Sequence, residues 1–291
     1  MLLPSYCDGP KLAICWWQSL NKTDNVMTSP TRILSSQYYR PLSDFALQIK
    51  ALSLGGVAQV WQARTGAEQP YSQQLLHADA RMGLLAVTQG QAYLGEQLLT
   101  PGLYITGCQQ HSKVLSCAAG THLLGARFHL AAQGSFIRQP AAEMVNQCIR
   151  IDDIDTAPQL HRAARFSEAQ PFFDLIKTLS SHLPRQQQVL SGAAIEVCTN
   201  SADLAEQLGK TPRTIERYCK HHIGISLRSI HKLQRVARAR ERIKHQRQTS
   251  LTELSYALNF ADQAHFSRQF KQVVGLSPRD YQQLKWANHS A

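Results

Sequence analysis

The stretch "NFADQAHFSRQFKQVVGLSPRDY", residues 259–281, decides the fold of the C-terminal part of this chain. Phe266 and Phe270 lie four residues apart, so both fall on one face of a helix, and polar residues separate them. Asp262 is placed to cap the start of this helix, and Gly275 is placed to end it. The pattern predicts a short helix anchored by aromatic side chains, with a polar face left exposed.

A looser copy of this pattern lies upstream, in "DLAEQLGKTPRTIERYCKHHIGISL". Arg217 precedes Arg268 by 51 residues, and Gly224 precedes Gly275 by the same 51 residues. Each copy reads as a short helix, a turn and a second helix that ends at a glycine. This is the helix-turn-helix arrangement, in which the second helix enters the major groove of DNA. We therefore expect two such units in tandem. Thr211 is placed to cap the second helix of the first copy.

The second helix of each unit has one face for the core and one for a partner. In the first copy Ile215 and Cys219 share the inward face. Arginine can bridge O6 and N7 of guanine, and glutamine can pair with adenine, so outward residues of these types suit base recognition. The outward residues are Arg213, Glu216, Arg217 and Lys220 in the first copy, and Gln263, Ser267, Arg268 and Lys271 in the second.

Positive charge is concentrated in the last third of the chain. Residues 185–291 hold 17 Lys/Arg and 8 Asp/Glu, whereas the preceding 184 residues hold 14 and 12. This asymmetry predicts a polyanionic partner, either nucleic acid or a membrane surface. The basic segment "LRSIHKLQRVARARERIKHQ" between the two copies reads as one long helix. Such a connector could hold the two second helices about 34 Å apart, which is one turn of DNA.

Residues 190–288 resemble the DNA-binding domain of the AraC/XylS family of bacterial transcription regulators. The residues that carry the resemblance are "LGKTPRTIERYCKHHIGISL", "RARERI" and "LNFADQAHFSRQFKQVVGLSPRDY". The resemblance implies double-stranded DNA as the partner, with base-reading positions at Arg213, Glu216, Arg217, Gln263, Ala264, Ser267 and Arg268. The positions expected to contact the DNA backbone are Thr211, Lys220, Arg235, Arg238, Lys271 and Arg279.

Three positions depart from the family pattern. Asn259 stands where the family usually has glycine, and asparagine tolerates a left-handed backbone. Cys219 replaces the usual aromatic residue, so the first unit is expected to be packed less firmly than the second. Glu216 is acidic, which suits a cytosine amino group but repels phosphate.

The N-terminal part reads as β-structure. Short alternating or apolar runs from about residue 43 to 131 are broken by glycines, which is typical of an antiparallel sandwich or a small barrel. Residues 123–154 also resemble the small β-rich N-terminal domain found in one group of these regulators. A helix is expected over 172–183 because its apolar residues form one stripe. The fold class is therefore α+β, with a cupin-like β-rich domain followed by an all-α domain.

The expected organisation has three parts. These are an irregular leader over 1–30, a β-rich sensory or dimerisation domain over 31–184, and a DNA-binding domain over 185–291 with units at about 202–224 and 252–275. The helical domain is expected to contain seven helices, beginning near Val189, Ala202, Pro212, Leu227, Thr252, Gln263 and Pro278.

Composition excludes several other classes. No apolar stretch has the length of a transmembrane helix, and the N-terminus lacks the basic start of a signal peptide, so a cytoplasmic, nucleoid-associated protein is expected. The seven cysteines are widely spaced without a C-x-x-C, and His122 and His129 lack a neighbouring ligand set. Neither a metal nor another cofactor is expected.

The leading hypothesis is a sequence-specific transcription regulator and not an enzyme. Its N-terminal domain would sense a signal or mediate self-association. RNA polymerase is a candidate partner and a homodimer a candidate assembly, while the effector is not identified. One alternative is a cupin-like enzyme tethered to DNA, which needs a metal triad or a nucleophile. Another is a DNA-repair protein with a reactive cysteine, which calls for a cysteine cluster near the N-terminus, and Cys7 and Cys15 are too sparse to form one.

Overall fold

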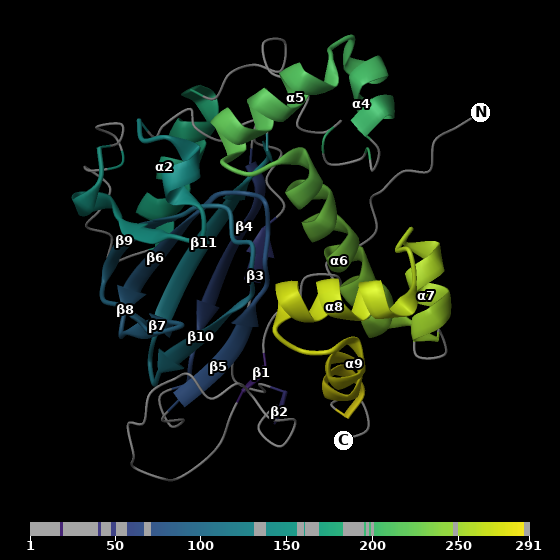
Figure 1. Cartoon of the computed structure of the whole chain (residues 1–291). Coiled ribbons are helices and arrows are strands. Elements are labelled where there is room, and N and C mark those ends of the chain that lie inside the picture. Colours follow the sequence, from purple (N-terminus) through teal and green to yellow (C-terminus); the bar gives the residue numbers. More distant parts are fainter. Residues whose placement is uncertain are drawn as a thin grey trace.

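The structure, a computed structural model, has a β-rich domain followed by a helical domain (Figure 1). The predicted α+β fold class is confirmed. Most of the leader and the helix predicted near Val189 lie outside the described residues, although Gln18–Ser19 within the leader form a short strand. The structure describes residues 18–19, 40–41, 48–50, 57–66, 71–130, 138–155, 160, 169–182, 195, 198, 201–246 and 250–287.

The β-rich domain consists of antiparallel strands in two main sheets. One sheet has the order β12-β9-β6-β11-β4-β3 and the other the order β5-β10-β7-β8, while β1 pairs with β2. The strands are β1 (Gln18–Ser19), β2 (Arg40–Pro41), β3 (Gln48–Lys50), β4 (Val57–Arg64), β5 (Tyr71–Leu76), β6 (Gly83–Gln89), β7 (Ala92–Leu94), β8 (Gln97–Leu99), β9 (Gly102–Thr106), β10 (Lys113–Ala118), β11 (His122–Phe128) and β12 (Cys148–Arg150).

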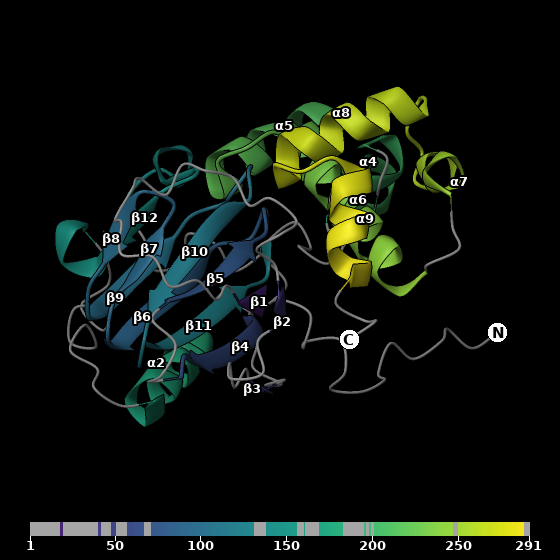
Figure 2. The same ribbon diagram turned by 90° about the horizontal axis from the view of Figure 1, so that it is seen from below.

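The two sheets pack face to face (Figure 2). Strand β6 shows how one strand serves two cores, because alternate side chains of a strand point to opposite faces. Leu85 and Val87 are buried against the four-stranded sheet, whose Leu115 belongs to the same cluster. Leu84 and Ala86 point the other way, into a second cluster. The six-stranded sheet is therefore apolar on both faces.

Helix α2 (Ala169–His182) covers the outer face of the six-stranded sheet. Phe172, Ile176 and Leu179 recur at helical spacing and are buried against strand residues of the second cluster. The helix predicted over 172–183 is thus confirmed up to residue 182, and residue 183 lies outside the described part of the chain.

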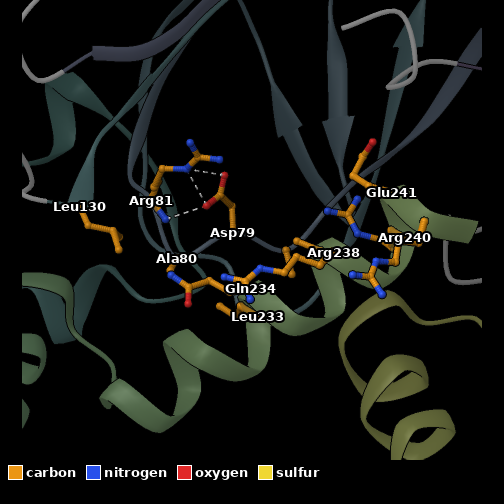
Figure 3. Close-up of a pocket in the computed structure, with 12 residues that line it drawn as sticks. Asp79, Ala80, Arg81, Leu130, Leu233, Gln234, Arg238, Arg240 and Glu241 are labelled. Atoms are coloured by element: carbon orange, nitrogen blue, oxygen red, sulfur yellow. Dashed lines mark hydrogen bonds and ion pairs between the residues drawn. The ribbon is translucent and has the colours of Figure 1, made fainter. Parts of the chain in front are cut away.

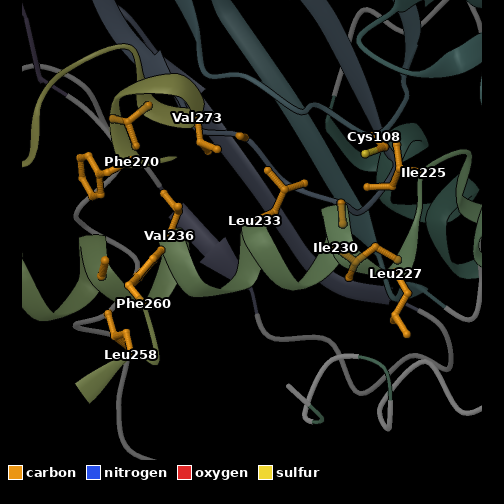
Figure 4. Packing of buried hydrophobic residues seen from close by; sticks show 14 of the residues in the cluster. Cys108, Ile225, Leu227, Ile230, Leu233, Val236, Leu258, Phe260, Phe270 and Val273 are labelled. Carbon is orange, nitrogen blue, oxygen red and sulfur yellow. The ribbon is translucent and has the colours of Figure 1, made fainter. Parts of the chain in front are cut away.

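The helical domain is built around α6, which runs between two smaller groups of helices (Figure 1). Leu233 and Val236 on α6 pack with Phe270 and Val273 of α8 in one continuous core (Figure 4). The helices after residue 200 are α4 (Ser201–Leu208), α5 (Pro212–Tyr218), the π-helical turn η6 (Cys219–Ile223), α6 (Leu227–His245), α7 (Leu251–Ala257), α8 (Gln263–Val274) and α9 (Pro278–Ala287). In the described parts of the chain, no helix combines the length and the apolar character needed to cross a membrane.

Candidate nucleic-acid interface

The first predicted unit is a helix-turn-helix formed by α4 and α5. Gly209 supplies the turn with a left-handed φ of 58°. The Thr211 hydroxyl accepts a hydrogen bond from the Thr214 N–H at 3.2 Å, which confirms the predicted cap of α5. Ile215 and Cys219 are fully buried beneath the helix. The inward face predicted from their spacing is therefore confirmed, and it holds the outward face in place.

Three predicted DNA-contacting residues lie on the exposed side of this unit. Arg213, Arg217 and Lys220 are exposed. Together with Pro140 and Ala142 of the β-rich domain, they line a hollow of about 610 Å³. The structure thus brings these cations together beside the N-terminal domain, and their contact with DNA remains a prediction.

Glu216 also lines this hollow, but its carboxylate has a partner within the protein. Oε2 accepts a hydrogen bond from the Leu227 N–H at 3.1 Å, and Oε1 lies 3.7 Å from Lys220 Nζ. Leu227 is the first residue of α6, where backbone N–H groups lack helical partners and a negative charge is favourable. Glu216 therefore caps α6, a role that sequence spacing did not reveal. Base reading by Glu216 would require breaking this bond.

The second unit is formed by α7 and α8. Ser250 and Glu253 make a reciprocal capping box at the start of α7. Asn259 has a left-handed φ of 56°, as expected where the family carries glycine. Asp262 accepts a hydrogen bond from the His265 N–H at 2.6 Å, which confirms the predicted cap of α8. These local signals set the length and direction of the helix.

Aromatic packing anchors α8 from below. The rings of Phe266 and Phe270 are 5.6 Å apart in an edge-to-face arrangement. Phe270 also meets Tyr281 of α9 at 5.5 Å, and Phe266 meets Phe260 at 5.0 Å. Such pairs add to the stabilisation gained by burial alone. The apolar face predicted from the four-residue spacing is confirmed.

The opposite face of α8 is open. Ser267 is partly buried, and the Gln263 Oε1 atom accepts a hydrogen bond from the Thr252 hydroxyl at 2.7 Å. This bond fixes the direction of the amide at the start of the helix. The exposed residues of the second unit that were predicted to touch DNA are Gln263, Ala264, Arg268, Lys271 and Arg279.

Arg235 of the connector α6 is engaged within the helical domain. Its guanidinium lies 5.1 Å from the centre of the Phe260 ring and donates a hydrogen bond to the Asn259 carbonyl at 3.3 Å. Burial, and then the charge of Arg228, lower the pKa of Arg235. This side chain therefore holds the turn of the second unit against α6. A phosphate contact by Arg235 remains a prediction.

Arg238 lies on the side of α6 that faces the β-rich domain. It lines a hollow of about 580 Å³ together with Gln234 and with Asp79 and Arg81 of the loop between β5 and β6 (Figure 3). This position favours a role at the domain interface over the predicted contact with DNA phosphate. Asp79, Arg81 and Gln234 of this interdomain hollow were not singled out in the sequence, because they approach Arg238 only in the tertiary structure.

The charge of Asp79 is maintained at this interface. Its carboxylate pairs with Arg81 Nε at 3.1 Å. Burial acts to raise the pKa of Asp79, but the charges of Arg81 and Arg127 and hydrogen bonds from Arg81 outweigh it, so the pKa lies below its usual value. The pair therefore stays ionised at neutral pH beside the arginines of α6.

The cysteines and possible metal ligands bear on the two alternative hypotheses, a DNA-repair protein with a reactive cysteine and a cupin-like enzyme tethered to DNA. Burial raises the pKa of four described thiols to about 12, so they are protonated at neutral pH. These four are Cys108, Cys117, Cys148 and Cys219. The two cysteines of the repair hypothesis, Cys7 and Cys15, lie outside the described residues. Among the residues that the structure describes, no group of three or more His, Cys, Asp or Glu could hold a metal ion.

Comparison with protein families and curated sequences matches the helical part of the chain. A family described as "Helix-turn-helix domain" matches residues 204–284. The HTH-type transcriptional activator RhaS of Salmonella newport is 36% identical over 90 residues, which cover 31% of this chain and 31% of RhaS. RhaS of Salmonella agona matches to the same extent. The match spans about a third of the length of these curated relatives.

Solved structures show weaker likeness over more of the chain. ToxT from Vibrio cholerae aligns with 82% of this chain and 97% of its own, at 10% identity and a TM-score of 0.40. An AraC-type regulator from Chromobacterium violaceum aligns with 32% of this chain and 82% of its own, at 26% identity and a TM-score of 0.29. Scores this low establish no shared arrangement, so the architecture rests on the topology described above.

Proposed function

We propose that this chain, whose helical C-terminal domain belongs to the AraC/XylS family, is a sequence-specific DNA-binding transcription regulator. Its two helix-turn-helix units would read two adjacent major grooves through α5 and α8. The observation that carries this proposal is that Arg217 and Arg268 occupy equivalent positions in the two units. Both are exposed on second helices whose undersides are fully buried, at matching positions of the two units.

Base reading would fall mainly to residues with suitable donor groups on the exposed faces of α5 and α8. Arg213 and Arg217 in the first unit, and Gln263 and Arg268 in the second, have the donor groups that suit guanine and adenine. Backbone contacts by Lys220, Lys271, Arg279 and the cap at Thr211 would supply most of the affinity, because phosphate neutralisation dominates DNA binding.

The β-rich domain and the place of action complete the proposed function. We place the domain division at 31–184 and 185–291, with signal sensing or self-association in the first part. The matched relatives are transcriptional activators, which favours activation and points away from an enzyme. The protein would act in the cytoplasm, where it could reach both DNA and RNA polymerase.

Selection of bound duplexes from random DNA by the full chain tests this function. We expect recovered sites to contain two different half-sites about 10 base pairs apart, centre to centre. Affinity should fall steeply with added salt, with a slope set by the number of neutralised phosphates. Recovery of no enriched sequence would overturn the proposal.

A further inference from the structure

We call α5 and α8, the helices proposed to enter the major grooves, the first and second reading helices. The β-rich domain contacts the C-terminal end of the second reading helix, α8. The Ser112 N–H donates a hydrogen bond to the Val273 carbonyl at 2.8 Å. The His111 ring donates from Nδ1 to the Gln272 carbonyl at 2.9 Å. Both carbonyls belong to the last turn of α8, where helical acceptors lack partners within the helix. The loop between β9 and β10 therefore supplies donors that α8 itself cannot.

The same domain also meets the end of the first reading helix. Gly224 follows η6 with a left-handed φ of 86°. A Cβ atom at this glycine would lie 2.4 Å from the Ala141 carbonyl oxygen and 2.8 Å from Val145 Cγ2. The close approach of the two backbones thus needs glycine. Ala141 begins the short helix η4 (Ala141–Met144) of the β-rich domain.

The two contacting segments of the β-rich domain are bonded to each other through Asn146. Its N–H donates to the Cys108 carbonyl at 2.7 Å, and its Oδ1 accepts from the Gln110 N–H at 2.7 Å. Lys113 Nζ donates to the Asn146 carbonyl at 2.6 Å. Asn146 itself adopts a left-handed φ of 62°. A continuous series of contacts therefore runs from the end of one reading helix to the end of the other.

We propose that this series of contacts is a strut that fixes the relative position of the two reading helices, and so sets the spacing of half-sites that the protein accepts. The strut comprises residues 107–113 and 141–146. It acts beside α6, the connection predicted from the sequence. Two units joined by one helix can turn about that helix, whereas a second connection between their ends removes this freedom. Figure 1 shows both α5 and α8 running toward the sheets, with α6 between them.

The inference rests on the proposed function, because spacing matters only if both units bind DNA. In that case a signal sensed by the β-rich domain could act by moving residues 107–113 relative to residues 141–146. Gly224, Asn146 and Ser112 would be positioning residues, which touch no DNA.

The matched glycines Gly224 and Gly275 provide the test. Both follow reading helices in left-handed conformations, with φ values of 86° and 87°. A Cβ atom would meet the β-rich domain at Gly224, but at Gly275 nothing lies within 4 Å. Gly224→Ala and Gly275→Ala therefore impose the same backbone strain, and only the first disturbs the strut.

The measurement is the binding of full chains to the duplex recovered by selection and to the same duplex with two base pairs inserted between its half-sites. The insertion turns one half-site by about 70° and should weaken binding by the wild-type chain about tenfold or more. We expect Gly224→Ala to reduce this penalty to less than about threefold, while Gly275→Ala retains it. Equal penalties in both variants would overturn the strut. A wild-type chain that enriches no DNA would instead refute the proposed function.

A second pair of variants decides the matter if Gly224→Ala does not fold. Ser112→Pro removes the N–H that bonds to Val273, whereas Ser112→Ala keeps it, and both remove the hydroxyl that accepts from the Ala78 N–H at 3.2 Å. Ser112→Pro should lose the discrimination against the insertion, and Ser112→Ala should retain it. If both variants keep the discrimination against the insertion, the proposed strut is contradicted. Thermal unfolding of each variant verifies that it is folded.

Discussion

The two helix-turn-helix units share one framework but are packed by different side chains. The second unit buries Phe270 between Phe266 and Tyr281, whereas the matching position of the first unit holds Cys219. In place of an aromatic anchor, the first unit uses contacts outside itself. Glu216 caps α6, and Gly224 meets the β-rich domain. The two units thus differ in their buried anchor, which is an aromatic ring packed against Tyr281 of α9 in the second and a small thiol in the first, while both contact the β-rich domain.

The largest expected effect follows from the aromatic anchor. Phe270→Ala should reduce the free energy of unfolding by about 3–5 kcal/mol, because it removes a fully buried ring and leaves a cavity. Cys219→Ala removes one buried sulfur and should cost only about 1 kcal/mol. Urea unfolding measures both. Tyr256→Ala, at a site 65% exposed, is the control and should change stability by less than about 0.5 kcal/mol. Equal losses at 219 and 270 would remove the distinction between the units.

Arg217 and Arg268, the proposed base-reading arginines, should behave alike despite the difference in packing. Arg217→Ala and Arg268→Ala should each lose about 1–3 kcal/mol of binding to the selected duplex, and each should relax preference in a different half-site. Lys271→Ala is the control, because a phosphate contact weakens binding to specific and random DNA equally and reduces the salt slope. Competition binding at several salt concentrations separates these cases. An arginine variant that weakens both kinds of DNA equally would not be a base reader.

His77 should make the stability of the folded protein depend on pH. Its ring lies 5.9 Å from that of Tyr281, and burial, followed by the charges of Arg240, Lys285 and Lys244, holds its pKa well below 6.5. The folded protein keeps His77 neutral, whereas the unfolded chain binds a proton as the pH falls through about 6.5. Burial of the neutral His77 ring therefore does not reduce the free energy of unfolding above that pH. Below it, stability falls by up to about 1.4 kcal/mol per pH unit until the lowered pKa is reached.

Urea unfolding between pH 7.5 and 5.5 measures this slope. The variant His77→Gln should flatten it, because glutamine has no proton to gain. The exposed His245 provides the control as His245→Gln. A slope left unchanged by His77→Gln would show that other groups cause it.

The smallest expected effect concerns Glu216, which caps α6. The second unit has Ser267 at the position that matches Glu216. Glu216→Ala should destabilise the protein by about 1 kcal/mol, since the Leu227 N–H loses its acceptor. Glu216→Gln keeps an oxygen acceptor and should cost less. Thermal unfolding ranks the two variants. If both leave the preferred DNA sequence unchanged, Glu216 is a cap alone; a shift in one base pair would support the reading role predicted from the family.

Local signals explain which features could be predicted from the sequence. The caps at Thr211 and Asp262, the left-handed Asn259 and the apolar stripe of Phe266 and Phe270 depend on residues close in the chain, and all are confirmed. The β-strands of the N-terminal part were also predicted, from short apolar or alternating runs that glycines interrupt. The order of strands within the sheets was not, because pairing joins segments far apart in the sequence.

Tertiary contacts account for the features that the sequence did not reveal. Glu216 is an outward residue by helical periodicity, and only the approach of Leu227 turns it into a cap. Arg235 and Arg238 were expected to contact the DNA backbone, and the sequence did not reveal that one lies on Phe260 and the other lines the interdomain hollow. The bonds from the Ser112 and Asn146 N–H groups to the Val273 and Cys108 carbonyls join backbone groups, which no pattern of side chains discloses.

Methylation interference on the selected duplex tests whether α5 and α8 enter two adjacent major grooves. Methyl groups at guanine N7 block the major-groove edge that arginine would bind. We expect two patches of interference about 10 base pairs apart, of which Arg217→Ala erases one and Arg268→Ala the other. A single patch, or two patches that survive both substitutions, would contradict this arrangement.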